Sequence, residues 1–416
     1  MKLSNKLTIY IIISMLAGVA LGYLIHVNSS SDSIQAFSKN IKLLTTIFLR
    51  LVQMIIAPLV FATLVVGIAK LGDLKTVGRV GGKALLWFIS ASLVSLLLGM
   101  LLVNLFKPGA GIDLGNADMS GAKDLVGKTQ EFSLAKFVEH VFPKSVVEAM
   151  ATNEILQLVI FSIFFGIATA ALGEKGKIVV KGLDAVAHVI LKMVGYVMNF
   201  APLGVFGAIA AVIATKGLEV FWFYGKYLLY FLMGIASLWL VLLTAGFLIL
   251  RRRLPELLKR IVSPLIIAFS TTSSEAVFPK LTEELENFGC KDRIVSFILP
   301  LGYSFNLDGS MMYMTFASLA IAQAYGIHID LGTQLTMLIV LMLTSKGIAG
   351  VPRASLVVVT ATCAMFNIPP EGIALILPID HFCDMFRTAT NVLGNALATT
   401  VVSKWEGALE NSVTNQ

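Results

Sequence analysis

Five polar side chains recur along an apolar segment near the C-terminal end of the chain. They are separated by four, three, four and four positions: Asp380, Asp384, Arg387, Asn391 and Asn395. At about 100° per residue, this spacing places them on one narrow face of an α-helix. A charged side chain at the centre of a bilayer costs on the order of 2.5–3.5 kcal/mol by insertion scales, so the stripe indicates a polar partner.

The charges of this stripe suggest what the partner is. An internal ion pair between Asp384 and Arg387, three positions apart, is one interpretation, but it leaves the other polar groups unexplained. A solute that carries both charge signs accounts for more of the stripe. Arg387 can bind a carboxylate through two parallel hydrogen bonds, while Asp384 pairs with an ammonium group. The pattern therefore favours binding of an acidic amino acid.

A second polar interruption lies upstream, at residues 304–310 (Ser-Phe-Asn-Leu-Asp-Gly-Ser). Asn, Asp and Gly inside an apolar segment favour local unwinding of a helix, which frees backbone carbonyls. Hard monovalent cations bind such carbonyls together with a carboxylate, and Asp308 would supply the charge. A kink packed by neighbouring helices is the alternative, but it does not explain the acid.

Membrane-spanning helices must position these groups. The chain has 416 residues and is 57% hydrophobic but only 14% charged, which is more apolar surface than a soluble protein can cover. A spanning helix needs about 20 apolar residues. Pro202 predicts a kink in the fifth of six clear candidate spans. These spans are residues 7–27, 43–69, 84–106, 155–172, 185–214 and 220–250.

Clusters of basic residues orient the spans. Lys and Arg follow the second, fourth and sixth spans and flank the start of the first, so alternating spans place every cluster on one side. Cytoplasmic loops are enriched in Lys and Arg, so that side is predicted to be the cytoplasm and residues 107–153 to lie outside. The net charge of +7 resides in these loops and does not indicate a nucleic-acid partner. We expect a multi-pass protein of the cell inner membrane.

Two later apolar segments are broken before they could cross a membrane. Their interruptions fall at residues 270–275 and 344–352, and a full span follows each, at residues 294–327 and 373–402. Irregular backbone at membrane depth is tolerated only inside protein or beside a wet cavity. Interrupted segments in corresponding positions therefore point to a transporter binding site. The first hairpin enters from the cytoplasm and the second from outside, so the two units should be inverted.

The chain resembles the glutamate transporter family, also called the dicarboxylate/amino acid:cation symporters. Residues 304–310 are similar to the family's Asn-Met-Asp-Gly signature. The serine-rich tip at 270–274, the Gly-Val-Pro tip at 350–352 and residues 384–391 match in the same order. The resemblance implies an all-α polytopic membrane protein with eight transmembrane helices and two reentrant helical hairpins in inverted repeats. It also implies an elevator mechanism and a homotrimer within membrane lipid.

The resemblance divides the chain into three parts. Residues 1–253 would hold six helices, of which helices 1, 2, 4 and 5 form a trimerisation scaffold and helices 3 and 6 join the transport domain. Residues 254–407 would form the transport core of hairpin 1, helix 7, hairpin 2 and helix 8. Residues 408–416 would be a cytoplasmic tail.

The resemblance also assigns substrate contacts. Arg387 would hold the side-chain carboxylate and Asp384 the amino group, while Ser274 and the backbone around Val351 hold the α-carboxylate. Ser310 stands where the family has a substrate-contacting Thr. The predicted substrate contacts are Ser274, Ser310, Val351, Asp384, Arg387, Thr388 and Asn391.

Monovalent cations are the expected co-substrates, and no cofactor is expected. One implied cation site uses the side chains of Asn306 and Asp308, and two others use mainly backbone carbonyls. The predicted cation positions are Ser92, Gly302, Ser304, Asn306, Asp308, Ser345, Lys346, Ile348, Asn391 and Asn395.

Three departures from the family pattern weaken the case for three sodium ions. Asn395 stands where sodium-coupled members place an Asp, and Leu307 replaces a Met. Phe88 and Ala91 replace a Tyr and a Thr, which leaves only Ser92 on that helix. These changes favour proton coupling, or fewer sodium ions.

Glu275 at the first hairpin tip is either a proton carrier or a solvated glutamate.

Several other functions compete with the hypothesis of an acidic amino-acid symporter. A C4-dicarboxylate carrier needs no acid that pairs with an ammonium, and a neutral amino-acid carrier needs no Arg387. An ion channel needs no paired opposite charges, and an enzyme is disfavoured because the five His are scattered without a nucleophile–base pair or metal triad. Symport of L-glutamate or L-aspartate with protons, sodium or both is therefore predicted.

Overall fold

The computed structural model describes residues 2–71, 74–110, 142–218, 224–345 and 354–410, and one isolated bridge apart, the regular elements in these ranges are helical. The helices up to residue 250 are α1 (Lys2–Asn28), α2 (Ser31–Leu71), α3 (Leu74–Phe106), α6 (Val146–Ala151), α7 (Ile155–Ala171), α8 (Glu174–Met198), α9 (Ala201–Lys216) and α11 (Gly225–Leu250). The later ones are α12 (Leu254–Thr271), α13 (Phe278–Asn287), α14 (Asp292–Phe305), α15 (Asp308–Ala324), α16 (Leu331–Thr344), α17 (Ala354–Met365) and α18 (Leu377–Trp405).

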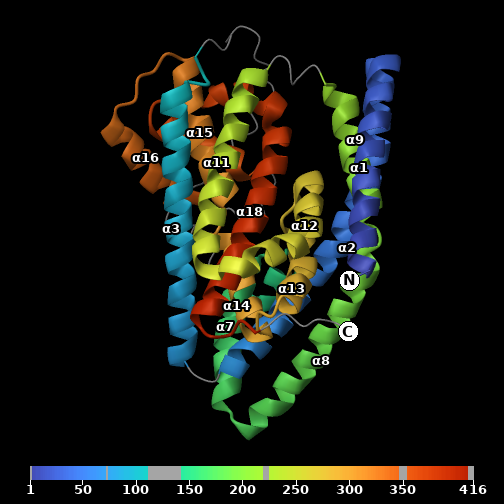
Figure 1. The fold of residues 1–416 in the computed structure, drawn as a ribbon, viewed down its shortest axis with the longest axis vertical. Coiled ribbons are helices and arrows are strands. Elements are labelled where there is room, and N and C mark those ends of the chain that lie inside the picture. The colour runs from blue at the N-terminus through green and yellow to red at the C-terminus, as the bar shows by residue number, and fades with distance from the viewer. Residues whose placement is uncertain (1, 72–73, 111–141, 219–223, 346–353, 411–416) are drawn as a thin grey trace.

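The helices gather in two groups (Figure 1). In one, α1 packs along α9, and α2 packs against α7, α8 and α9. In the other, α3, α11 and α18 surround α15, and α12 packs along α18. The first group contains the helices that we expect to form a scaffold and the second those that we expect to move, but this division stays a prediction.

Among the described residues, four helical runs are long and apolar enough to cross a membrane. The pair α8 and α9 makes a fifth, bent by 49° at a short break. The predicted kink is therefore present, and it falls just before Pro202 because proline is tolerated in the first turn of a helix. The four runs are Ile9–Asn28, Ser31–Ala69, Lys75–Phe106 and Gly225–Thr271.

Several helix ends differ from the predicted spans by one to about three turns. The helix α2 begins at Ser31 rather than residue 43, and α3 begins at Leu74 rather than residue 84, because polar residues extend each helix beyond its apolar stretch. The last helix begins at Leu377 rather than residue 373, since a 3₁₀ turn over Pro370–Leu375 precedes it.

The break predicted within a membrane span is present, and so is the break predicted at the tip of the first hairpin. The span predicted at 294–327 is divided into α14 and α15, and only Asn306 and Leu307 are non-helical, so the break is narrower than 304–310. Hairpin 1 consists of α12, an irregular tip and α13, with Thr272 in the left-handed region at φ 53°. Hairpin 2 has α16 and α17 as its arms. Its tip lies outside the described residues, and the predicted positions Lys346, Ile348 and Val351 lie there too.

A C-terminal strap (residues 406–410) crosses the base of hairpin 1. The Glu410 N–H donates to the Gly289 carbonyl at 2.8 Å, and the Lys291 N–H donates to the Ala408 carbonyl at 3.0 Å. Gly289 has φ 108°, and a Cβ there would lie 2.4 Å from the Glu410 carbonyl oxygen, so only glycine fits. Residues 408–410 thus pack on the core, although the sequence predicted a tail from residue 408.

Candidate functional site

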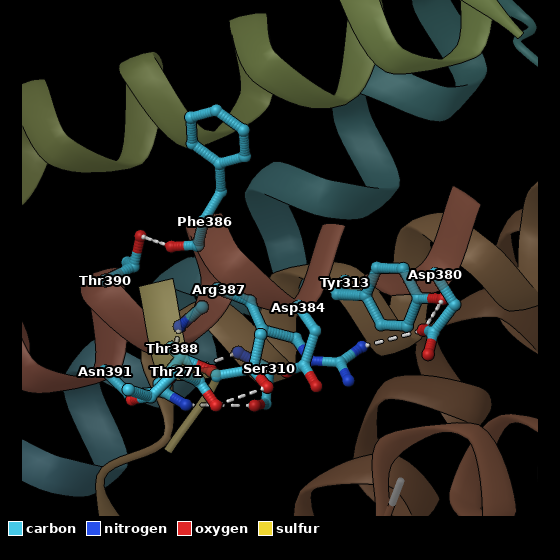
Figure 2. A network of polar contacts seen from close by, with 12 residues as sticks. Thr271, Ser310, Tyr313, Asp380, Asp384, Phe386, Arg387, Thr388, Thr390 and Asn391 are labelled. Atoms are coloured by element: carbon cyan, nitrogen blue, oxygen red, sulfur yellow. Dashed lines mark hydrogen bonds and ion pairs between the residues drawn. The ribbon is translucent and has the colours of Figure 1, made fainter. Parts of the chain in front are cut away.

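Arg387 lies at the centre of the polar stripe on α18. Its Nε is 2.9 Å from Asp384 Oδ1, and its Nη1 is 3.3 Å from Asp380 Oδ1. The guanidinium also lies over the ring of Tyr313, 4.4 Å from the ring centroid. Figure 2 shows this group. One buried cation is therefore shared by two carboxylates.

Tyr313 and Asp380 form the fixed side of this network. The Tyr313 hydroxyl donates to Asp380 Oδ1 at 2.8 Å, and both residues are buried. The Tyr313 ring packs edge-to-face on Phe231. Sequence reasoning placed Asp380 on the stripe without a role and overlooked Tyr313. The sequence did contain a signal for the role of Asp380, because this residue lies two helical turns before Arg387 and so on the same face of the helix.

Asp384 is the more accessible of the two acids. Its side chain is 22% exposed, compared with 4% for Asp380 and 3% for Arg387. It also accepts a hydrogen bond from Thr388 Oγ1 at 3.2 Å. Asp384 is therefore the acid of the pair that solvent contacts, while Asp380 stays covered.

Asn391 joins α18 to the start of α15. Its Oδ1 accepts the backbone N–H groups of Gly309 at 2.8 Å and Ser310 at 3.2 Å. Its Nδ2 donates to Ser310 Oγ at 3.0 Å. These bonds satisfy first-turn N–H groups of α15 and hold that helix end beside the arginine. The structure thus brings together most of the predicted substrate contacts: Ser310, Asp384, Arg387, Thr388 and Asn391.

Hairpin 1 approaches the same face. Thr271, at the end of α12, is drawn with this group in Figure 2, and α12 packs along α18. Ser274 and Glu275 lie just beyond it at the tip, and both are partly buried. Glu275 is thus neither freely solvated nor fully enclosed, and the roles of both residues stay predictions.

A second polar cluster lies where the break between α14 and α15 faces α18. Asn306, Asp308 and Asn395 are each at most 1% exposed. Asn306 Nδ2 donates to Asp308 Oδ2 at 3.1 Å. Asn306 Oδ1 and both amide atoms of Asn395 have no hydrogen-bond partner within the described part of the chain. Leaving such buried groups unpaired costs roughly 1–3 kcal/mol each. The unpaired oxygens of Asn306 and Asn395, together with the Asp308 carboxylate, fit a cation.

Glycines allow the helices around this cluster to approach closely. A Cβ at Gly394 would lie 2.0 Å from Asp308 Oδ2, and one at Gly302 would lie 2.3 Å from Asn395 Oδ1. The Phe88 ring of α3 also lies beside Gly302. The cluster is therefore small and shaped by glycines on two helices.

The other predicted cation positions that the structure describes are buried but have fewer contacts with this cluster. Ser304 Oγ is buried without a hydrogen-bond partner among the described residues. The Gly302 carbonyl accepts the Asn306 N–H at 2.8 Å. Ser92 is fully buried one turn after Phe88, and Ser345 Oγ donates to the Met342 carbonyl at the end of α16. Their part in cation binding stays a prediction.

Comparison with known proteins identifies the family of this chain. The model of the sodium:dicarboxylate symporter family matches residues 7–405, almost the whole chain. The chain belongs to the sodium:dicarboxylate symporter family. The resemblance recognised in its motifs is thereby confirmed. Like its relatives, this member of the symporter family is a polytopic, all-helical membrane transporter and not an enzyme.

The relatives carry two kinds of name. The chain is 40% identical to the proton/sodium-glutamate symport protein of Geobacillus stearothermophilus, covering 87% of this chain and 86% of that protein. It is 38% identical to the C4-dicarboxylate transport protein of Bacillus subtilis, covering 99% and 96%. It is 41% identical to the C4-dicarboxylate transport protein of Laribacter hongkongensis, covering 99% and 92%. Family membership alone does not choose between these substrates.

Proposed function

We propose that this symporter imports L-glutamate and L-aspartate, coupled to protons, sodium ions or both. The observation that carries the proposal is the contact between Arg387 and the accessible acid Asp384. With both carboxylates ionised, Asp380 and Asp384 together exceed the single charge of Arg387 by one negative charge. Asp384 can exchange its partner because it is the exposed member of the network.

Substrate binding would rearrange these charges. A carboxylate of the substrate would replace Asp384 on Arg387, and the released Asp384 would pair with the substrate ammonium. A C4-dicarboxylate has no ammonium, so the released acid would face a like charge. At about 4 Å and an effective dielectric constant near 20, two like charges repel by about 4 kcal/mol. The pocket therefore favours an amino acid that carries both charge signs.

A C4-dicarboxylate symporter is the alternative, and the names of the relatives support it. It would require Asp384 to be protonated or neutralised by a bound cation. A neutral amino-acid symporter is less favoured, because Arg387 would remain without an anionic ligand.

The buried cluster supports cation coupling. Asp308 provides a negative charge, and Asn306 Oδ1 provides an unused oxygen beside it. Asn395 contributes no charge, which favours protons or few sodium ions. Glu275, at the partly buried tip of hairpin 1, is the second candidate for carrying a proton. We further propose a homotrimer in the cell inner membrane whose transport domain moves as an elevator against its scaffold.

Uptake by reconstituted protein tests the proposal. Labelled glutamate, aspartate and succinate are offered to proteoliposomes while sodium and pH gradients are imposed separately. Accumulation of both amino acids, driven by at least one gradient and weakly inhibited by succinate, is expected. Accumulation of succinate without competition from either amino acid would overturn the substrate proposal. Uptake driven by sodium alone, with no pH dependence, would remove protons from it.

A further inference from the structure

Three consecutive arginines follow the long apolar helix α11. They form an arginine turn (Arg251–Arg253), a 3₁₀ turn between α11 and α12. Arg251 adopts φ 52°, which ends α11 abruptly after Leu250. The apolar helix thus gives way within one residue to three positive charges.

One arginine of this turn faces the protein. Arg253 Nη1 donates to the Glu410 carbonyl at 2.7 Å, and its Nη2 donates to the Phe288 carbonyl. Its guanidinium also lies over the Phe288 ring, 4.4 Å from the centroid. Arg253 is therefore used in packing, and it fixes the position of the turn against hairpin 1 and the C-terminal strap.

The other two arginines face outward. Arg251 and Arg252 are exposed, and neither forms an ion pair with a carboxylate that the structure describes. Lys259, farther along α12, is exposed as well. Within the described residues these charges have no acidic partner, so they are available to a negatively charged ligand from outside the chain.

Exposed apolar side chains adjoin this charge. Phe247 and Leu248, one turn before the arginines, are 54% and 71% exposed, and Leu240 two turns earlier is 69% exposed. On α12, Val262 is 40% exposed. Exposed apolar side chains on a membrane-spanning helix are therefore followed by two guanidinium groups that have no carboxylate partner among the residues the structure describes.

We propose that Arg251 and Arg252 bind the headgroup phosphate of an anionic phospholipid whose acyl chains lie along Phe247 and Leu248. Guanidinium groups bind phosphate oxygens through paired hydrogen bonds. The apolar strip precedes the arginines on α11, part of a run long and apolar enough to span a membrane, so the acyl chains of the same lipid would lie along it. The order of apolar and basic groups along α11 thus matches the order within a phospholipid.

Lipid retention by the purified full-length protein tests this proposal. Native mass spectrometry measures binding of phosphatidylglycerol and phosphatidylcholine with identical acyl chains. The double variant Arg251→Gln/Arg252→Gln is expected to lose roughly thirty-fold in affinity for phosphatidylglycerol, with phosphatidylcholine unchanged. Lys175→Gln/Lys177→Gln is the matched control. It removes two exposed charges from the first turns of α8, predicted on the same side, one of which is paired with Glu174, and it should leave both lipids unaffected.

Several outcomes would overturn the proposal. Equal retention of the two lipids by the unaltered protein would do so, as would a preference for phosphatidylglycerol that survives in the arginine variant. A photoreactive phosphatidylglycerol is expected to label residues 240–252, and labelling confined to other helices would contradict the assigned position. Capture of an acidic soluble protein in place of lipid would assign the arginines to a protein partner. Glutamate uptake by both double variants verifies that they fold.

Discussion

Arg387 contacts two acids that differ in exposure to solvent. Asp380 is buried and receives the Tyr313 hydroxyl, so it fixes the guanidinium from one side. Asp384 is partly exposed, and its partners within the described part of the chain, Arg387 and Thr388, lie on its own helix. A binding site that must release its ligand benefits from such a division, because one partner positions the arginine and the other can leave it.

Replacement of Asp384 tests this division. Asp384→Asn is expected to reduce glutamate and aspartate uptake by at least tenfold, since a hydrogen bond to a charged group contributes about 1.5–3 kcal/mol. Succinate uptake should be retained or increased, because the acid that repels a dicarboxylate is gone. Initial uptake rates over a range of substrate concentrations measure both effects.

A matched control is Asp380→Asn, which removes a charge from the opposite side of the same guanidinium. It should reduce uptake of every substrate whose carboxylate binds Arg387, because it removes one partner that positions the guanidinium. Asp384, the proposed partner of the substrate ammonium, is left unchanged. Glutamate uptake that persists unchanged in Asp384→Asn would contradict the proposed exchange of partners.

The sequence predicted only part of this network. Asp384 and Arg387 were recognisable because their spacing on one helix is set by helical geometry. Tyr313 was not recognisable, since its bond to Asp380 joins α15 to α18 across 67 positions of sequence. Such pairing depends on how helices pack, which no local pattern records.

At the scale of elements, glycines set the approach of helices around the cation cluster. Gly394 of α18 lies against Asp308, and Gly302 of α14 lies against Asn395. Interruption of the span at 304–310 was predicted from its Asn, Asp and Gly residues. The close approach of the helices was not predicted, because the sequence does not show which residues of another helix will pack against a glycine.

Gly394→Ala tests the importance of this crossing. The added methyl would lie 2.0 Å from Asp308 Oδ2, so the carboxylate must leave its bond with Asn306. We expect at least a tenfold loss of cation-driven uptake, measured in proteoliposomes. Gly195→Ala on α8 is the control, since nothing lies within 4 Å of its new methyl. Equal uptake by the two variants would show that the crossing tolerates a side chain.

The ends of α3 and α18 are joined by an ionic contact that depends on pH. Glu406 accepts hydrogen bonds from Lys83 Nζ at 2.6 Å and from Arg79 at 3.0 Å. Partial burial acts to raise the pKa of Glu406, but the bonds and charges of Lys83 and Arg79 outweigh it and hold the pKa below its usual value. The charged form is therefore favoured in the folded protein.

Glu406→Gln is expected to lower the melting temperature by a degree or two at pH 7, since partly exposed ion pairs contribute about 0.2–1 kcal/mol. A lowered pKa gives stability that is present above about pH 4.3, the ordinary Glu value, and is lost as pH falls through the folded pKa. The difference between the two proteins should therefore vanish in strong acid. Thermal unfolding in detergent over a pH series measures it, and a constant difference would contradict the assignment.

At the scale of the whole molecule, the distribution of basic residues predicts which loops face the cytoplasm. The three cysteines Cys290, Cys363 and Cys383 are all buried, so they give little background to thiol reagents. A membrane-impermeant maleimide should label Ser30→Cys in intact cells. Lys177→Cys, whose native side chain is 65% exposed, should react only after permeabilisation. The reverse pattern would invert the predicted topology.

The two groups of helices were beyond sequence reasoning from the residues alone. Apolar length located most of the helices, and α18 was recognised in spite of its charged stripe. However, the packing of α1 along α9 joins segments far apart in the chain, and it rests on small residues such as Gly18 and Gly22 facing α9. Such contacts follow from shape, and family resemblance was needed to anticipate the grouping.

The C-terminal strap has a practical consequence. Because Glu410 and Ala408 are hydrogen-bonded to the loop between α13 and α14, residues 408–410 and the base of hairpin 1 are held together. A distance probe attached beside Glu410 would therefore follow hairpin 1 and α18 as one body. Truncation before Ala408 would remove these hydrogen bonds, so labels and affinity tags should be placed after residue 410.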